Sequence, residues 1–303
     1  INSGQLCEPG TGVFLASHPN RRDTDIISLH IIESGADIIL SGGESFLLPE
    51  GMIGRHGKPG VRKDGQNLIL QAVDLGYRVV YTRDELLSMP LETNKILGVF
   101  AAGHTFNDET EEELRKMDVP LYGRSAPTAA EMLQVTLKIL ESKKKPFLVV
   151  LEEEGSDNFA NKNNARGMLE SLRRADRALG VALDFIDRHP KTMLITTADS
   201  DAGGMHMIGI RNPEKFEKSL PETGVNGAPL DGRDGTATLP FTAAPDQFGN
   251  RLRFGICWAS SEDLGGGVVT KAHGLNAQLL PQNVDNTDIY RMIYATLFGK
   301  WLP

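Results

Sequence analysis

The sequence has few cysteines, no excess of basic charge and no long hydrophobic run. Its 303 residues include two cysteines, Cys7 and Cys257, without a CxxC pair, which excludes a thiolate zinc knuckle. We expect both to be small buried side chains rather than a disulfide. The net charge of −8 argues against a nucleic-acid partner, because such proteins need a basic face. No run of about 18 apolar residues occurs, so we expect no transmembrane helix and no membrane partner.

Helical and strand-like patterns alternate along most of the chain. Helical spacing of apolar residues predicts helices at 24–35, 65–76, 83–88, 128–142, 165–188 and 286–299. Short apolar runs predict strands at 38–40, 77–82, 96–101, 147–151 and 193–195. This alternation predicts an α/β fold with a mostly parallel central sheet and helices on both faces.

One long segment breaks the alternation. Residues 203–272 are rich in Gly, Pro, Asn and Asp, which favours an inserted subdomain over another βα unit. Residues 1–202 and 273–303 would then form the α/β core. Within these parts we expect an acidic loop at 105–120, a strand at 277–280, and Asn286 or Thr287 as the N-cap of the last helix.

Acidic and amide side chains follow the predicted strand 147–151. Glu152, Glu153, Glu154 and Asp157 are the acids in the stretch LEEEGSDNFANKNN. They form either a solvated acidic loop or a set of hard oxygen ligands at the carboxyl edge of a sheet, where open α/β folds bind their ligands.

The predicted strand 193–195 has a similar end. It leads into Asp199, Ser200 and Asp201. A right-handed crossover through one long helix places two parallel strand ends on the same edge. We therefore predict a shared metal or phosphate site between the two acidic ends.

Several stretches, in order, resemble the alkaline phosphatase family. They are SGADIILSGGESFLLP, KDGQNLILQAVDLGYRVVYTRDELL, LEEEGSDNFAN, ITTADSDAGGM, KAHG and NTDIYRMIYATLFG. The similarity runs over nearly the whole chain, and it implies the three-layer α/β fold and a crown-like insertion at 203–272.

The resemblance also implies roles for individual residues. Arg22, eleven residues after Thr11, would clamp two phosphate oxygens, because a planar guanidinium matches phosphate in a bidentate way. The implied metal ligands are Thr11 and Glu152 at a magnesium site, Asp157 and His273 at one catalytic metal, and Asp199 at the other.

Two positions depart from the family pattern at the metal site. Asn161 and Ser200 stand where the family has imidazoles. Zinc favours imidazole, whereas oxygen donors suit Mg²⁺, Ca²⁺ or Mn²⁺. An all-zinc pair is therefore not expected, although the family implies Zn²⁺. Asn161, Ser200 and Asp201 are further candidate ligands, as are Glu153 and Glu154.

A third departure concerns the nucleophile. No stretch matches the family's serine motif, so we expect the serine on polypeptide outside these residues. The resemblance then implies a metal-dependent phosphomonoester hydrolase acting on small phosphate esters, with this chain alone inactive. The alternatives are a catalytically impaired phosphatase-like binding protein and a phosphodiester or sulfate-ester hydrolase. A homodimer and a periplasmic or secreted location are expected by resemblance, although no signal peptide is visible.

Overall fold

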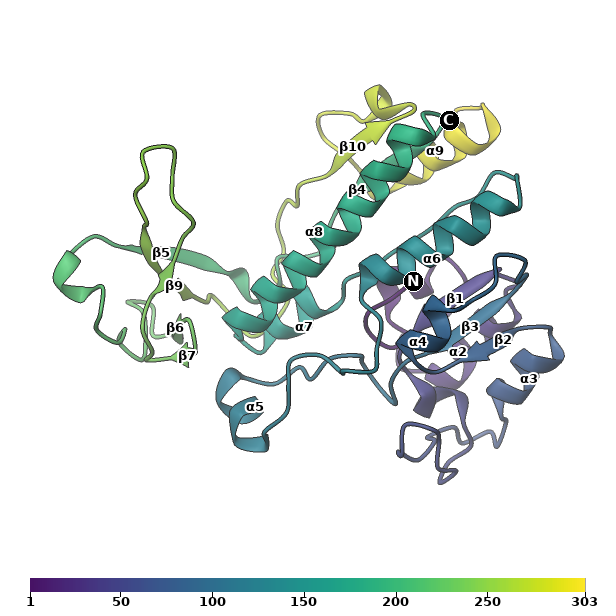
Figure 1. Cartoon of the computed structure of the whole chain (residues 1–303), viewed down its shortest axis with the longest axis horizontal. Coiled ribbons are helices and arrows are strands. Elements are labelled where there is room, and N and C mark those ends of the chain that lie inside the picture. The colour runs from purple at the N-terminus through teal and green to yellow at the C-terminus, as the bar shows by residue number, and fades with distance from the viewer. Residues whose placement is uncertain (303) are drawn as a thin grey trace.

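Three parallel strands form the centre of one end of the molecule (Figure 1). The computed structural model describes residues 1–302. The strands are β1 (Ile38–Ser41), β2 (Arg78–Val80) and β3 (Ile96–Val99), in the spatial order β1-β3-β2. Ile38 of β1 and Arg78 of β2 both pair with Ile96 of β3. The three predicted strands at 38–40, 77–82 and 96–101 are confirmed.

Helices cover both faces of this sheet. Side chains alternate between faces along a strand, so Ile39 and Leu97 pack against α2 (Thr24–Glu33) and α3 (Leu68–Asp74). Leu40 and Ile96 point the other way and pack against α4 (Arg83–Leu87) and α6 (Ala129–Ser142). The layered α/β fold expected from the sequence is therefore present.

Local capping explains where several helices begin. Thr82 and Thr128 each accept a hydrogen bond from the backbone N–H three residues on, and the glutamate there bonds back, forming capping boxes. The last helix, α9 (Asn286–Phe298), is capped by Asp285. The predicted cap at Asn286 or Thr287 is wrong, because the Asp285 carboxylate accepts the Thr287 N–H at 2.9 Å.

The N-terminal segment lies between β1 and the acidic strand end. Asn2 N–H donates to Leu40 O at 2.8 Å, and Ser3 N–H donates to Glu152 O at 3.1 Å. Both neighbours run parallel to the segment, through bridges from Asn2 to Glu152 and from Gln5 to Gly42. The segment carries Asn2 and Thr11 to the place where Glu152 lies.

The predicted strand at 147–151 does not form a ladder. Among the described residues, its backbone partner is the short segment just named, with a bridge only at Glu152. Phe147, Val149 and Leu151 still pack between α6 and α8 (Ala165–Arg188). The apolar pattern was predicted correctly. The strand was not, because residues 147–151 have no hydrogen-bonded neighbour long enough to form a ladder with them.

The second acidic strand is paired differently from the prediction. β4 (Met193–Thr196) pairs antiparallel with β10 (Lys271–Gly274), as a separate two-stranded sheet. It does not share a ladder with 147–152 in the described structure. α9 lies beside these strands in Figure 1. Residues 277–279 form the 3-10 helix η4 (Ala277–Leu279), so the strand predicted at 277–280 is wrong.

An antiparallel sheet occupies the opposite end of the molecule (Figure 1). Its strands are β5 (His206–Ile210), β6 (Leu230–Gly232), β7 (Gly235–Thr236), β8 (Phe241–Thr242) and β9 (Arg253–Cys257). Buried Trp258 follows β9 and packs against Ala160 and Ala165 on neighbouring helices. The boundaries at 203 and 272 stay a prediction.

The remaining elements are short. They are α1 (Pro9–Gly12), α5 (Glu111–Met117), α7 (Gly155–Asn161), η1 (Glu44–Leu47), η2 (Ala202–Gly204) and η3 (Pro213–Lys215). Because α5 is helical from Glu111, with Thr110 as its cap, the prediction of a loop throughout 105–120 is wrong.

Both cysteines lie in the core. Cys7 and Cys257 are both free and buried, which confirms the prediction that they are small core side chains. Burial raises the pKa of the Cys7 thiol to about 12. Within residues 1–302, no helix combines the length and apolar character that crossing a membrane requires.

Candidate metal and phosphate site

Thr11 and Glu152, which the family resemblance implied as magnesium ligands, are in contact. Thr11 Oγ1 donates to Glu152 Oε2 at 3.3 Å. Asn2 Nδ2 donates to both, at 2.9 Å to Thr11 Oγ1 and 2.6 Å to Glu152 Oε2. Gly10 leaves room for the carboxylate, because a Cβ there would collide with Glu152 Oε1. The structure therefore brings together two of the predicted ligands from opposite halves of the core.

The acids beside Glu152 are buried. Glu153 and Glu154 are each 9% exposed. Ser3 Oγ donates to Glu153 Oε1 at 2.9 Å and accepts the Glu154 N–H at 3.0 Å. Tyr122 OH also donates to Glu153 Oε1, at 2.8 Å. A solvated acidic loop is thus excluded for this part of the stretch.

Crowding of carboxyls changes their protonation. Burial, followed by repulsion from Glu152 and Glu8, raises the pKa of Glu154 to about 10. The raised pKa favours the protonated form of this carboxyl, and burial also raises the pKa of its neighbour Glu152. Burial and then Asp263 raise the pKa of Asp157 to about 7. Such a site favours the addition of positive charge, as protons or as metal ions.

Asp157 and Asn161 lie one helical turn apart on α7. Asn161 Nδ2 donates to Asp157 Oδ1 at 3.0 Å and to Asp263 Oδ1 at 2.8 Å. Asn161 Oδ1 is buried and has no hydrogen-bond partner among the described residues. The position where the family has an imidazole therefore holds an amide whose oxygen has no hydrogen-bond partner among the described residues.

Asp199 lies within electrostatic reach of the same group. It contributes to the raised pKa of both Glu152 and Asp157, although β4 does not pair with the segment that carries them. The loop after it is tied to the β9–β10 connection, since Asp201 N–H donates to Leu264 O at 3.5 Å and Gly203 N–H to Glu262 O at 3.2 Å.

Two predicted residues are not brought to this group. His273 is exposed on β10, opposite Leu194, and within residues 1–302 no hydrogen bond or ion pair joins it to Asp157. Arg22 is exposed, and its one described hydrogen bond is from its backbone N–H to Asn20 Oδ1 at 3.1 Å. Their assigned roles stay predictions.

Three residues near the site were not foreseen. Repulsion from Glu8 helps to raise the pKa values of Glu152, Glu154 and Asp157. The Glu8 carboxylate oxygens lie 3.6 Å from Arg21 Nη2 and 3.8 Å from His104 Nε2. Asp263 contacts Asn161 as described above. Long loops bring in His104 and Asp263, so no sequence spacing marks them, whereas Glu8 is only three residues from Thr11.

The donor chemistry of this group suits a hard cation. Its members are carboxyl, amide and hydroxyl oxygens, which bind Mg²⁺, Ca²⁺ and Mn²⁺ in preference to softer ions. The orphaned Asn161 Oδ1 supports the same fit. No cluster of three or more His, Cys, Asp or Glu side chains within residues 1–302 is already arranged around one point as a metal cage.

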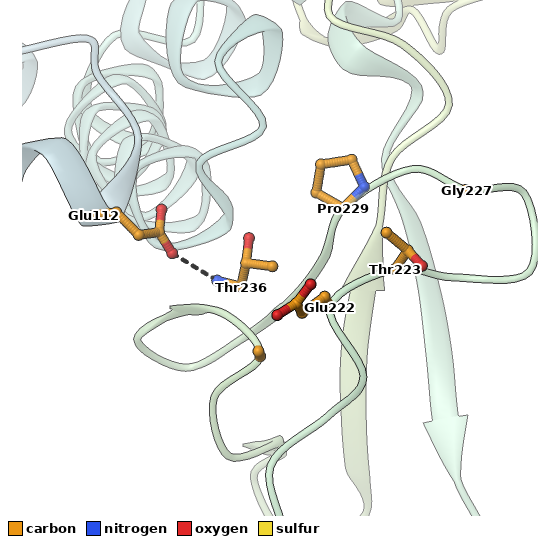
Figure 2. A pocket seen from close by; sticks show the side chains of 7 residues that line it. Glu112, Glu222, Thr223, Gly227, Pro229 and Thr236 are labelled. Carbon is orange, nitrogen blue, oxygen red and sulfur yellow. Dashed lines mark hydrogen bonds between the residues drawn. The ribbon is translucent and has the colours of Figure 1, made fainter.

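A separate pocket of about 490 Å³ lies between α5 and the antiparallel sheet (Figure 2). Glu112 and Glu222 contribute the acids of its lining, and Glu112 accepts the Thr236 N–H at 2.9 Å. None of its lining residues belongs to the candidate metal site.

The curated proteins whose sequences are similar to this chain are alkaline phosphatases. Membrane-bound alkaline phosphatase of Bombyx mori is 26% identical over 170 residues, covering 54% of this chain and 29% of that protein. Alkaline phosphatase 3 of Bacillus subtilis is 24% identical over 297 residues, covering 86% of this chain and 58% of that protein. The chain thus spans less than two thirds of the length of these relatives.

Solved structures show the same fold. Thermus thermophilus alkaline phosphatase superposes with a TM-score of 0.71 at 22% identity, covering 99% of this chain and 71% of that one. The enzyme from the Antarctic bacterium TAB5 superposes with a TM-score of 0.68 at 15% identity, with coverage of 98% and 71%. A family model described as alkaline phosphatase matches residues 15–297. This chain therefore belongs to the alkaline phosphatase family.

Proposed function

We propose that this chain is the larger part of a metal-dependent phosphomonoester hydrolase. The observation that carries the proposal is the meeting of Thr11 and Glu152, at 3.3 Å, beside the acidic group of Asp157 and Asp199. Family membership supports a phosphatase-type hydrolase.

The proposed ions are Mg²⁺ and two further divalent metals. Thr11 and Glu152 would hold the first, Asp157 and His273 the second, and Asp199 the third, with Asn161, Ser200 and Asp201 as further candidate donors. A TAB5 variant binds Mg in its M3 site, which supports magnesium by analogy. When bound, a pair of divalent ions stabilises the attacking and leaving oxygens of an in-line displacement. The oxygen-rich donors make Mg²⁺, Ca²⁺ or Mn²⁺ better candidates than Zn²⁺.

This chain would contribute binding and orientation rather than the nucleophile. The Arg22 guanidinium would hold two non-bridging oxygens of the phosphate, where negative charge must be stabilised during transfer. Because no stretch matches a serine motif, we propose that the attacking serine lies on polypeptide outside these 303 residues. The isolated chain would then lack turnover.

The family relation also suggests a substrate class, an assembly and a location. We propose small phosphate esters as substrates, a homodimer as the assembly, and a periplasmic or secreted location. Each rests on the family relation rather than on a contact within the chain.

The direct test is turnover of p-nitrophenyl phosphate by the full-length protein. We expect activity that requires an added divalent ion and that falls at least about 100-fold in Arg22→Ala, because a positioned charge donor contributes about two orders of magnitude or more. Arg251→Ala, at another exposed arginine, serves as the matched control. Folded protein without turnover in Mg²⁺, Mn²⁺, Ca²⁺ or Zn²⁺ would contradict the proposal.

The amide at Asn161 and the hydroxyl at Ser200 favour a second candidate, a phosphatase-like protein that binds an ion or anion without catalysis. Calorimetric binding of Mg²⁺ or inorganic phosphate, with no turnover of phosphomonoester, phosphodiester or sulfate-ester substrates, would favour it. Turnover of only the diester or the sulfate ester would instead indicate a different hydrolase on this fold.

A further inference from the structure

A cavity of about 210 Å³ lies against α1 and the turn that follows it. The backbone stays helical as far as Ala16, whose N–H donates to Gly12 O at 2.9 Å. Lining residues recur here at positions i, i+3, i+4 and i+7, which places them on one face of the helix; they are Pro9, Gly12, Val13 and Ala16. Thr11, which contacts Glu152, falls on the other side of the helix, so the cavity is separate from the candidate metal site.

Much of the remaining wall is apolar. Ile27 of α2 and the Cys7 side chain both line the cavity, and both are buried. Burial raises the pKa of the Cys7 thiol to about 12, so the thiol stays protonated and behaves as a small apolar group. The wall therefore suits the uncharged part of a ligand.

The polar part of the lining is basic. It consists of Ser17, His18 and Arg21, and no acidic residue among those that the structure describes belongs to the lining. In a chain whose net charge is −8, this composition favours an anion over a cation. The Arg21 side chain is 70% exposed, and its Nη2 lies 3.6 Å from Glu8 Oε2, which is too long for a hydrogen bond. The guanidinium donors are therefore open to a ligand.

His18 is oriented by residues of its own loop. Its Nδ1 lies 3.1 Å from Asn20 O and 3.5 Å from Asp23 Oδ2, and it also accepts the Asn20 N–H at 3.3 Å. Nε2 has no hydrogen bond to any described residue. It carries a proton both in the imidazolium and in the neutral tautomer in which Nδ1 accepts, so it is a second donor for an anion.

We propose that this cavity is a binding site for a small organic anion, namely a carboxylate attached to a short apolar chain or ring. The planar guanidinium of Arg21 matches a carboxylate in a bidentate way, and His18 Nε2 adds a further donor. The apolar wall would cover the carbon part of the ligand, as in other small-molecule sites. The site does not include Arg22, so it does not depend on the proposed phosphatase activity.

Benzoate is the probe, and benzylamine, which has the same ring and the opposite charge, is its control. Binding to the full-length protein is measured by ligand-observed nuclear magnetic resonance titration, without any assay of activity. We expect benzoate to bind with a dissociation constant on the order of 1 mM, and benzylamine to bind at least about 10-fold more weakly. Circular dichroism checks that wild type and every variant are folded.

Two substitutions test the lining. Arg21→Ala should weaken benzoate binding by at least about 5-fold, a size limited by the exposure of this side chain. Ala16→Leu should weaken it at least as much, because the larger side chain fills the cavity. Arg251→Ala, at an exposed arginine outside the cavity, is the matched control and should leave the affinity unchanged.

Several results would overturn the site. Folded wild type that binds no benzoate would refute it, as would equal affinities in wild type, Arg21→Ala and Ala16→Leu. Equal binding of benzylamine would refute the preference for an anion. A loss in Arg22→Ala but not in Arg21→Ala would place benzoate at the proposed phosphate clamp instead. Wild type that binds benzoate in this cavity but hydrolyses no phosphate ester would contradict the proposed function and leave this site intact.

Discussion

Thr11 Oγ1 lies 3.3 Å from Glu152 Oε2, although 141 residues separate them in the sequence. The N-terminal segment makes this possible, because it pairs with β1 on one side and with the backbone around Glu152 on the other. Asn2 Nδ2 donates to both side chains and fixes their relative position. The family resemblance implied both residues as magnesium ligands, and that role stays a prediction.

Glu152→Gln should weaken Mg²⁺ binding by about 10-fold or more, because a neutral amide replaces a charged oxygen ligand. Isothermal titration calorimetry on full-length protein measures the change. Glu92→Gln, at an exposed glutamate, is the control and should leave the affinity unchanged. Equal affinities in all three proteins would remove Glu152 from the site.

Gly10→Ala should impair ion binding with little effect on stability. The added Cβ would collide with the Glu152 carboxylate, which can move because it is the end of a flexible side chain. We expect the free energy of unfolding to change by less than about 1 kcal/mol, since alanine also favours the helix, while Mg²⁺ affinity drops.

A matched control for this change lies on α8. Gly180 is exposed, and a Cβ there would meet no atom within 4 Å. Gly180→Ala should stabilise the protein by about 0.5–1 kcal/mol through helix propensity and leave Mg²⁺ affinity unaltered. The reasoning fails if Gly10→Ala binds Mg²⁺ like Gly180→Ala.

Glu111 should make stability depend on pH. Burial, followed by repulsion from Asp231, raises the pKa of Glu111 to about 7 in the folded state, against an ordinary value of 4.5. Between these values the folded state binds more protons at Glu111, so the contribution of Glu111 to stability is fully present below pH 4.5 and is lost as pH rises through 7, by on the order of 1–3 kcal/mol.

Urea unfolding at pH 5 and pH 8 measures this effect. Glu111→Gln should lose less stability between the two pH values than wild type, because the amide cannot ionise. Glu92→Gln, at an exposed site, should behave like wild type. A Glu111→Gln variant with an undiminished pH response would show that other carboxyls carry the whole effect.

Trp258→Phe should destabilise the antiparallel end of the molecule. Trp258 Nε1–H donates to Asp231 Oδ2 at 2.8 Å, and both residues are fully buried. Removing the donor leaves a buried carboxyl short of a partner, which costs about 1–3 kcal/mol. Thermal and urea unfolding report the change. Trp301→Phe, at a tryptophan 45% exposed, should shift stability by less than about 0.5 kcal/mol; equal effects of the two substitutions would contradict this account.

Much of this protein follows from its sequence alone. The helix at 165–188 has the predicted bounds, since apolar residues recur at 3.6-residue spacing and Asn164 caps it. The oxygen character of the candidate site was also evident, because it depends on residue types. The chain's membership of its family was expected from several ordered stretches and is confirmed by the family match.

Tertiary structure decided what lies next to what. The apolar run 147–151 is not a laddered strand, because strand formation depends on a neighbour that the run itself does not encode. The placement of Asp263 beside Asn161 depends on hydrogen bonds from Asp201 and Gly203, which follow β4, to a loop some 60 residues later. Local patterns predict helices, strands and ligand types because those depend on nearby residues, whereas the geometry of a site depends on how distant segments pack.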